Sequence, residues 1–381
     1  MNFSPSSAPK CLATVLAAAL LGCGGSGDGI QEFEQGKEAY GLRDLGKAER
    51  LFEESLAAAP KDVDRIVWLA RTELDLGNLS RAGELMKQVS ALGCADADVL
   101  LLGAQVAWHA KDYEAAAKAF AAVGNDTKLD AETRSQGWAG LGVVEMTCDH
   151  QHLARIAFLR AIRLDRRNAS AWYHLGLLYR DGFRYLEAAL EQFEIFVRLE
   201  AEASPRVQKV QRTVIPGLKD EIARDATERP GVAKRNSAAC ATAIAKAEAA
   251  WKKGAFKNAR QAYQEALTAD PLSYQAALGL AKAWEKTDSS KTGLSSAYAN
   301  YKLACRLHPS SISTFLTAGA LASRLGLHSQ AVEVYSRAVA ASPTSLEALD
   351  GLVRSLRKVG KNGKVAESYQ RYRETLPSRK K

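Results

Sequence analysis

Few residues in this 381-residue chain have the types and spacing that catalysis or metal binding requires. Cys148, His150 and His152 lie close together, and thiolate and imidazole groups are good zinc ligands. A structural zinc site takes four ligands, however, and no fourth follows at a suitable spacing. The chain contains no H-E-x-x-H, G-x-S-x-G or P-loop motif. We therefore predict no catalytic, metal or cofactor-binding residue; an unrecognised activity at Cys148–His152 stays as the enzymatic alternative.

Cys23 follows a short apolar segment near the amino terminus. Cys11–Leu21 is too short to span a bilayer but has the length of a signal-peptide core. The segment leads into Leu-Leu-Gly-Cys at residues 20–23, which resembles the bacterial lipobox, where cleavage precedes the cysteine and the cysteine receives lipid. The resemblance implies a lipoprotein signal peptide at residues 1–22 and lipidation of Cys23. An ordinary cleaved secretory signal and a frayed cytoplasmic terminus are the alternatives.

Glycine dominates the residues that follow Cys23. Residues 24–29 read Gly-Gly-Ser-Gly-Asp-Gly, which is the composition of a flexible tether. Gly22, Gly24 and Gly27 also fit G-x-G-x-x-G, but a dinucleotide loop needs a strand before it and a helix after it. A signal segment precedes these glycines and no sheet pattern follows, so we interpret residues 23–29 as the lipidated cysteine and a tether.

A unit with helical spacing recurs along most of the chain, and Ile312–Ser345 is its clearest copy. Phe315 and Tyr335 belong to the apolar faces of two helices, which we expect to be joined by a turn at Leu325–Ser329. Pro343 ends the second helix, because proline has no backbone N–H to donate. The unit is therefore a pair of antiparallel helices.

The copies keep a common register. Their register residues are separated by 34, 34, 38, 34, 71, 38, 34 and 34 positions, and they are Ala48, Ala82, Ala116, Ala154, Ala188, Ala259, Ala297, Ala331 and Val365. The pattern resembles the tetratricopeptide repeat (TPR), a 34-residue helix pair. The resemblance implies an all-α fold: an α-solenoid of about nine TPR hairpins in two arrays, five and four, forming a right-handed superhelix.

The 71-residue step indicates a break between the two arrays. We assign repeats 1–5 to residues 30–203 and repeats 6–9 to residues 238–381, with an extra helix and a linker at 204–237 between them. Pro216 should kink or break the extra helix. Residues 225–237 are charged, turn-prone and poor in apolar side chains, which is typical of a linker.

The two parts of the chain carry opposite charge. Residues 23–203 hold 21 lysines and arginines against 29 aspartates and glutamates, a net charge of −8, whereas residues 204–381 have a net charge of +16. Opposite charges favour two surfaces with different tasks, although solvated helix faces can drift in charge without binding anything.

In TPR proteins the first helix of each repeat lines a concave groove. Carried over by register, the resemblance places a set of cationic and aromatic residues there: Lys252, Lys282, Lys286, Arg324, Arg354, Arg357, Lys358, Trp68, Arg71, Tyr173 and Trp251. Cations gathered in one groove favour acidic segments of a partner. Trp138, Trp172 and Trp284 occupy repeat core positions, and we expect them to be packing residues.

These observations predict a bacterial TPR lipoprotein that acts as a membrane-anchored scaffold for protein–protein interactions in the cell envelope, as an accessory part of an assembly, pilus or secretion machine. Its partners are other proteins or peptides, including acidic segments in the carboxy-terminal groove, and the membrane through lipid on Cys23. Gly24 after the cysteine favours the periplasmic face of the outer membrane. An exported protein seldom meets nucleic acid, so none is expected. The alternative is binding of an anionic envelope polymer, peptidoglycan or acidic polysaccharide, by the basic array.

Overall fold

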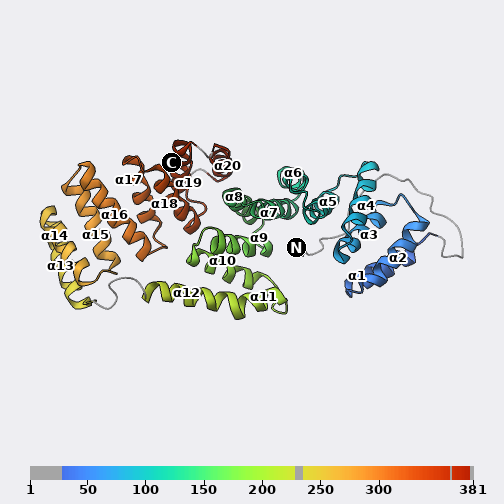
Figure 1. Ribbon diagram of the computed structural model, residues 1–381, viewed down its shortest axis with the longest axis horizontal. Coiled ribbons are helices and arrows are strands. Elements are labelled where there is room, and N and C mark those ends of the chain that lie inside the picture. Colours follow the sequence, from blue (N-terminus) through green and yellow to red (C-terminus); the bar gives the residue numbers. More distant parts are fainter. Residues whose placement is uncertain (1–27, 228–234, 361–362, 378–381) are drawn as a thin grey trace. The chain divides into compact units, whose positions relative to one another are not determined.

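The computed structural model describes residues 28–227, 235–360 and 363–377, and every regular element within them is helical (Figure 1). The chain divides into two compact units, one ending at His174 and the other beginning at Leu175. Within each unit, helices such as α1 and α2, α7 and α8, and α13 and α14 pack against one another as hairpins, which confirms the predicted all-α solenoid.

The first unit consists of antiparallel helix pairs whose starts are often capped by aspartate. The side chains of Asp44, Asp62, Asp112 and Asp130 each accept a hydrogen bond from a backbone N–H in the first turn of the helix that follows. The helices are α1 (Ile30–Gly41), α2 (Leu45–Ala58), α3 (Val63–Leu76), α4 (Leu79–Ala91), α5 (Ala97–His109), α6 (Tyr113–Asn125), α7 (Ala131–Thr147), α8 (Gln151–Leu164) and most of α9 (Ala169–Leu177).

The second unit begins within α9 and continues to the carboxy terminus. Serine caps several of its helices: Ser273, Ser290 and Ser345 each accept from a backbone N–H. Its elements are η1 (Leu178–Gly182), α10 (Leu186–Leu199), α11 (Pro205–Lys209), η2 (Val210–Val214), α12 (Ile215–Thr227), α13 (Ser237–Lys252), α14 (Phe256–Ala269), α15 (Tyr274–Thr287), α16 (Lys291–Leu307), α17 (Ile312–Arg324), α18 (His328–Ala341), α19 (Leu346–Val359) and α20 (Gly363–Glu374).

The predicted register describes the core well. Seven of the nine register residues are buried, namely Ala48, Ala82, Ala116, Ala154, Ala259, Ala297 and Ala331. Close helix contact explains their small size. Gly319, although not a register residue, shows how close such contacts are, since a Cβ there would lie 2.7 Å from the ring of Tyr335. The turn predicted at Leu325–Ser329 is also present, between α17 and α18.

The prediction for the fifth repeat was wrong by one residue. Ala188 is half-buried, and the following Ala189 is the fully buried residue, four positions before the buried Phe193. The preceding helix turn, η1, is π-helical, and a π turn accommodates one extra residue within a helix. The extra residue shifts the register. In the ninth repeat Val365 is likewise half-buried, and Ala366 is buried instead.

The polar insertion in the seventh repeat lengthens a helix rather than the turn. The polar residues at Thr287–Ser295 predict a long turn by composition, but only Asp288–Ser290 separate α15 from α16. Ser290 Oγ accepts from the N–H of Gly293 at 3.2 Å, so the cap starts α16 about one turn early.

Pro216 neither breaks nor ends its helix. α11, η2 and α12 follow one another without a gap, and the π-helical segment η2 ends two residues before the proline. Proline lacks the N–H that would bond to the carbonyl four residues earlier, and a local π turn accommodates that missing bond. The disturbance therefore appears as a change of helix type.

The boundary between the predicted arrays stays a prediction. Residues 204–237 lie inside the second unit, and the central part of the linker, 228–234, lies outside the described residues. The signal segment, Cys23 and most of the tether, within residues 1–27, also lie outside them. None of the described helices combines the length and the hydropathy needed to cross a lipid bilayer.

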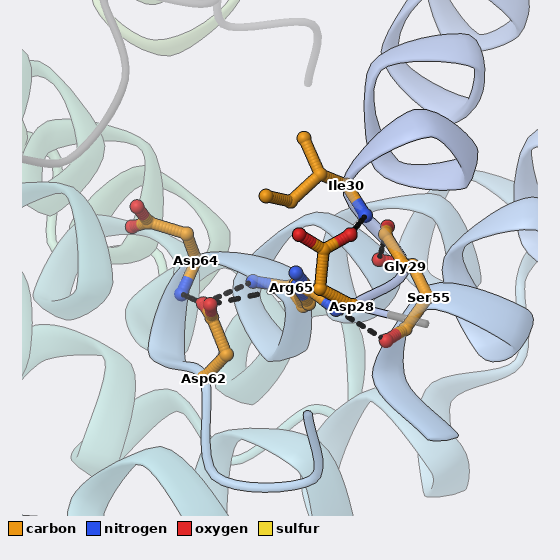
Figure 2. Close-up of polar contacts among 7 residues, drawn as sticks. All are labelled: Asp28, Gly29, Ile30, Ser55, Asp62, Asp64 and Arg65. Carbon is orange, nitrogen blue, oxygen red and sulfur yellow. Dashed lines mark hydrogen bonds and ion pairs between the residues drawn. The ribbon is translucent and has the colours of Figure 1, made fainter. Parts of the chain in front are cut away.

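A network of polar contacts around Arg65 lies at the start of the first hairpin (Figure 2). Arg65 is 6% exposed and donates from Nη1 to the carbonyl of Ser55 at 2.6 Å. Ser55 Oγ donates to the carbonyl of Gly29 at 2.7 Å, and Asp62 Oδ2 lies 3.5 Å from Arg65 Nε. Gly29 has a φ of +66°, and a Cβ there would lie 2.8 Å from Arg65 Nη1. Residue 29 is therefore held by α2 and α3 just before α1 begins.

Candidate functional site

A hollow of about 300 Å³ opens between the first helices of the sixth and seventh repeats, α13 and α15, with α14 beneath it. Its walls combine aromatic, aliphatic and charged side chains. They are Glu248, Trp251 and Lys252 from α13, Tyr263 from α14, and Gln275, Leu278, Gly279 and Lys282 from α15.

Tyr263 reaches the hollow because Gly279 has no side chain. A Cβ on Gly279 would overlap the ring of Tyr263, and Tyr263 is only 8% exposed. Burial, followed by the negative charge of Glu248, raises the pKa of Tyr263 above its usual value of 10. Its hydroxyl forms no hydrogen bond with another described residue.

Three of the residues predicted from the sequence line this hollow. Trp251 is half-buried and packs edge-to-face on Phe256, with ring centroids 5.0 Å apart. Lys252 and Lys282 are exposed and form no ion pair with a described residue. Sequence reasoning missed Gln275 and Leu278, although their spacing from Lys282 of seven and four residues marks one face of a helix.

A ladder of basic residues occupies one equivalent position in the first helices α13, α15, α17 and α19. Its members are separated by 34, 38 and 34 residues, and they are Lys252, Lys286, Arg324 and Lys358. All four are exposed and lie in the last turn of their helices. A cation at a helix carboxy terminus also interacts favourably with the helix dipole, so the ladder contributes to stability as well.

One residue of the ladder, Arg324, already has an ion-pair partner within the chain. Arg324 Nη1 lies 3.6 Å from Glu285 Oε1, and Glu285 Oε2 accepts a hydrogen bond from Tyr301 at 2.6 Å. Burial and this hydrogen bond raise the pKa of Tyr301. Arg324 is therefore less available to a partner than the sequence suggested.

The last first helix, α19, carries two further predicted cations. Arg354 and Arg357 are exposed and make no ion pair within the described part of the chain. Arg354 lies near Tyr335, whose pKa burial raises and the arginine charge partly lowers. Together with Lys358, these arginines make the end of α19 strongly basic.

The predicted residues of the first unit form an aromatic cluster. Trp68 stacks on Phe52, with ring centroids 5.8 Å apart, and its ring meets that of Tyr40 edge-to-face at 5.4 Å. The guanidinium of Arg71 lies 5.2 Å from the centroid of the Trp68 ring. Tyr40 donates to Asp75 Oδ2 at 2.8 Å. The side chains of this cluster are therefore already engaged in internal contacts.

Tyr173 lies on α9, three repeats beyond Trp68. It is half-buried, and its ring meets that of His174 edge-to-face at 5.1 Å. The predicted packing role holds for Trp138, which is 8% exposed. Trp172 and Trp284 are half-buried, and Trp172 Nε1 donates to the carbonyl of Arg166 at 2.9 Å.

One imidazole of the Cys148–His152 turn already contacts a carboxylate of the chain. His150 Nδ1 lies 2.8 Å from Glu145 Oε2. Within residues 28–227, 235–360 and 363–377, no three His, Cys, Asp or Glu side chains are grouped so as to hold a metal ion. The cysteines at 94, 148, 240 and 305 are free and buried or half-buried, as expected of small apolar residues.

Replacing Gly279 by valine is expected to lower the free energy of unfolding by about 1–3 kcal/mol, because the new side chain overlaps Tyr263 and forces helices α14 and α15 apart. Urea unfolding followed by circular dichroism measures the change. The matched control is Gly217→Val in α12, where a Cβ meets nothing within 4 Å. A Gly279→Val protein as stable as the control would contradict this packing.

A family model described as "Tetratricopeptide repeat" matches residues 33–93, 68–128 and 244–298. The crystal structure of MamA protein is 20% identical, with 49% of this chain and 96% of MamA covered and a TM-score of 0.36. Pseudomonas aeruginosa PilF is 18% identical, with 54% and 93% covered and a TM-score of 0.42. YrrB, a TPR protein with an unusual peptide-binding site, is 14% identical, with 49% and 93% covered and a TM-score of 0.35.

No curated protein sequence matches this chain. The three family matches fall on the helix hairpins α1–α6 and α13–α16, where the 34-residue register and its buried alanines were found. Two independent observations, the sequence match and the hairpin geometry, thus agree. The segments at residues 33–128 and 244–298 are therefore tetratricopeptide repeats.

Proposed function

We propose that this protein is a lipid-anchored scaffold of the bacterial cell envelope that holds acidic segments of its protein partners on the basic first helices of repeats 6–9. TPR proteins in general serve protein–protein interaction. The observation that carries the finer proposal is the basic ladder, since a cation recurs at the same position in four successive first helices. We further propose that the scaffold serves an assembly, pilus or secretion machine.

The proposal of acidic partners rests on the exposure of two of these cations and on their lack of ion pairs within the described part of the chain. Lys286 and Lys358 are exposed and have no ion-pair partner among the described residues, so a partner carboxylate need not displace an internal one. Charge-assisted hydrogen bonds are about twice as strong as neutral ones. Complementary charge also speeds the encounter and fixes the register of a bound segment.

The anchor is proposed from the lipobox-like residues that end at Cys23. Five residues separate Cys23 from Gly29, whose carbonyl accepts a hydrogen bond from Ser55, and Arg65 in turn donates to the carbonyl of Ser55 (Figure 2). A chain of that length reaches at most ~20 Å. Lipid on Cys23 would therefore keep the first repeat close to the membrane, which we propose is the periplasmic face of the outer membrane.

In-cell crosslinking followed by membrane solubilisation and identification of the retained molecules tests the scaffold. A reproducible, stoichiometric set of proteins is expected. Retention of glycan alone, lost when Arg354 and Arg357 are replaced by glutamate, would instead establish the alternative function, binding of an anionic envelope polymer. The ladder itself favours that alternative as second candidate, because regularly spaced cations suit a periodic polyanion.

Charge reversal on the ladder gives a quantitative test. Lys286→Glu together with Lys358→Glu is expected to weaken binding of the captured partner at least tenfold, about 1.4 kcal/mol, and to flatten its salt dependence. Surface plasmon resonance at two salt concentrations measures both. The control, Lys257→Glu with Lys302→Glu, makes the same charge change at exposed positions of the second helices α14 and α16. Equal loss in both variants would show that net charge, rather than the ladder, drives binding.

A further inference from the structure

We propose that the hollow between α13 and α15 receives a single aromatic or large aliphatic side chain of the bound segment, so that the protein selects acidic segments with an apolar anchor residue. This inference rests on the proposed function, since it assumes that acidic segments bind along these first helices. It adds a requirement that charge alone would not impose.

The walls of the hollow suit an apolar side chain. Trp251 and Leu278 face it from opposite helices, and the ring of Tyr263 lines it between them. All three are buried or half-buried. A volume of about 300 Å³ is at the lower end of the range for ligand pockets, which fits one side chain rather than a folded element. Aromatic anchors in such pockets commonly contribute most of the binding energy of an interface.

The charges around the hollow determine what flanks the anchor. Lys252 and Lys282 come from the two opposite helices, and both are exposed and free of ion pairs with described residues. Glu248 is the one carboxylate in the lining, and its charge acts on Tyr263. Carboxylates of the segment are therefore drawn toward the lysines, and Glu248 is left to accept backbone N–H groups of the segment.

The position of the anchor is specific to this gap. Trp251 occupies the residue before the ladder position, where the later repeats have Glu285, Ser323 and Arg357. At the next gap this position is polar, because Glu285 accepts a hydrogen bond from Tyr301 and pairs with Arg324. An apolar wall at this position occurs only beside α13 among the four first helices, which sets where along the array the anchor sits.

Fluorescence anisotropy with three labelled peptides tests the inference on the full chain. One peptide is acidic with a central phenylalanine (Gly-Asp-Glu-Phe-Asp-Glu-Gly), one has alanine in place of phenylalanine, and one keeps phenylalanine but has lysines in place of the acids. We expect the first to bind at least tenfold more tightly than either of the others. Gln275→Trp, which fills the hollow from an exposed rim position, should remove the advantage of phenylalanine over alanine. Gln264→Trp, exposed on α14, is the matched control and should keep it.

The outcomes separate the two levels of the proposal. Equal binding of both acidic peptides, unchanged by Gln275→Trp, would overturn the hollow as an anchor site and leave the basic groove standing. Failure of both acidic peptides to bind, or tighter binding of the lysine peptide, would overturn the inference together with the proposed preference for acidic segments. Loss of the phenylalanine advantage in Gln264→Trp as well would also overturn the hollow, since that residue lies outside it.

Discussion

Replacing Phe158 by alanine is expected to lower the free energy of unfolding by about 3–5 kcal/mol, one of the largest effects available in the first unit. Phe158 is fully buried, and its ring lies against Gly142, where even a Cβ would be 2.5 Å away. It also stacks on His174, with ring centroids 6.0 Å apart. Because α7 also packs against α6, it is poorly placed to collapse into the cavity.

The loss should be local, because each repeat of a solenoid contacts mainly its neighbours. Hydrogen exchange should show α7 and α8 opening far more readily, with little change in α16. Leu42→Ala is the control, since Leu42 is 76% exposed and its truncation should change stability by no more than about 0.5 kcal/mol. Uniform loss of protection throughout the chain would show that the units unfold as one.

The core could be predicted from the sequence because each repeat must place a small residue where two helices meet. Ala48, Ala154 and Ala331 follow that rule and are fully buried. The shift from Ala188 to Ala189 was missed, because the 34-residue period points to Ala188, while the π turn η1 before it adds one residue; only the four-residue spacing to Phe193 marks Ala189 in the sequence. An insertion has several helical solutions of similar energy, and only packing selects one.

The candidate site could be predicted in part, for a related reason. Register alone identifies the helix positions of Lys252 and Lys282, and both line the hollow. It does not show which cations are already paired, so the contact between Arg324 and Glu285 was missed. The hollow itself depends on Tyr263 reaching across from a second helix over Gly279, which is a contact between residues of different repeats.

Replacing Cys23 by serine is expected to remove nearly all of the protein from the membrane fraction. Serine cannot form the thioether through which the proposed lipid would be attached, and no described helix is apolar and long enough to replace that anchor. Each buried CH₂ group of an acyl chain contributes about 0.8 kcal/mol, and one chain gives only marginal binding, so stable anchoring needs at least two chains or a second signal. If Cys23 carries the proposed lipid, its replacement should therefore move almost all of the protein out of the membrane fraction.

Fractionation of cells labelled with a radioactive fatty acid measures both the lipid and the location. Cys11→Ser is the matched control, since Cys11 lies in the same apolar segment but precedes the lipobox-like residues. The control should keep the label and stay with the membrane, whereas Cys23→Ser should lose both. If Cys23→Ser still carried label, another residue would have to accept the lipid. If both variants left the membrane, the apolar segment rather than lipid on Cys23 would be the anchor, and the proposed position of the first repeat near the bilayer would fail with it.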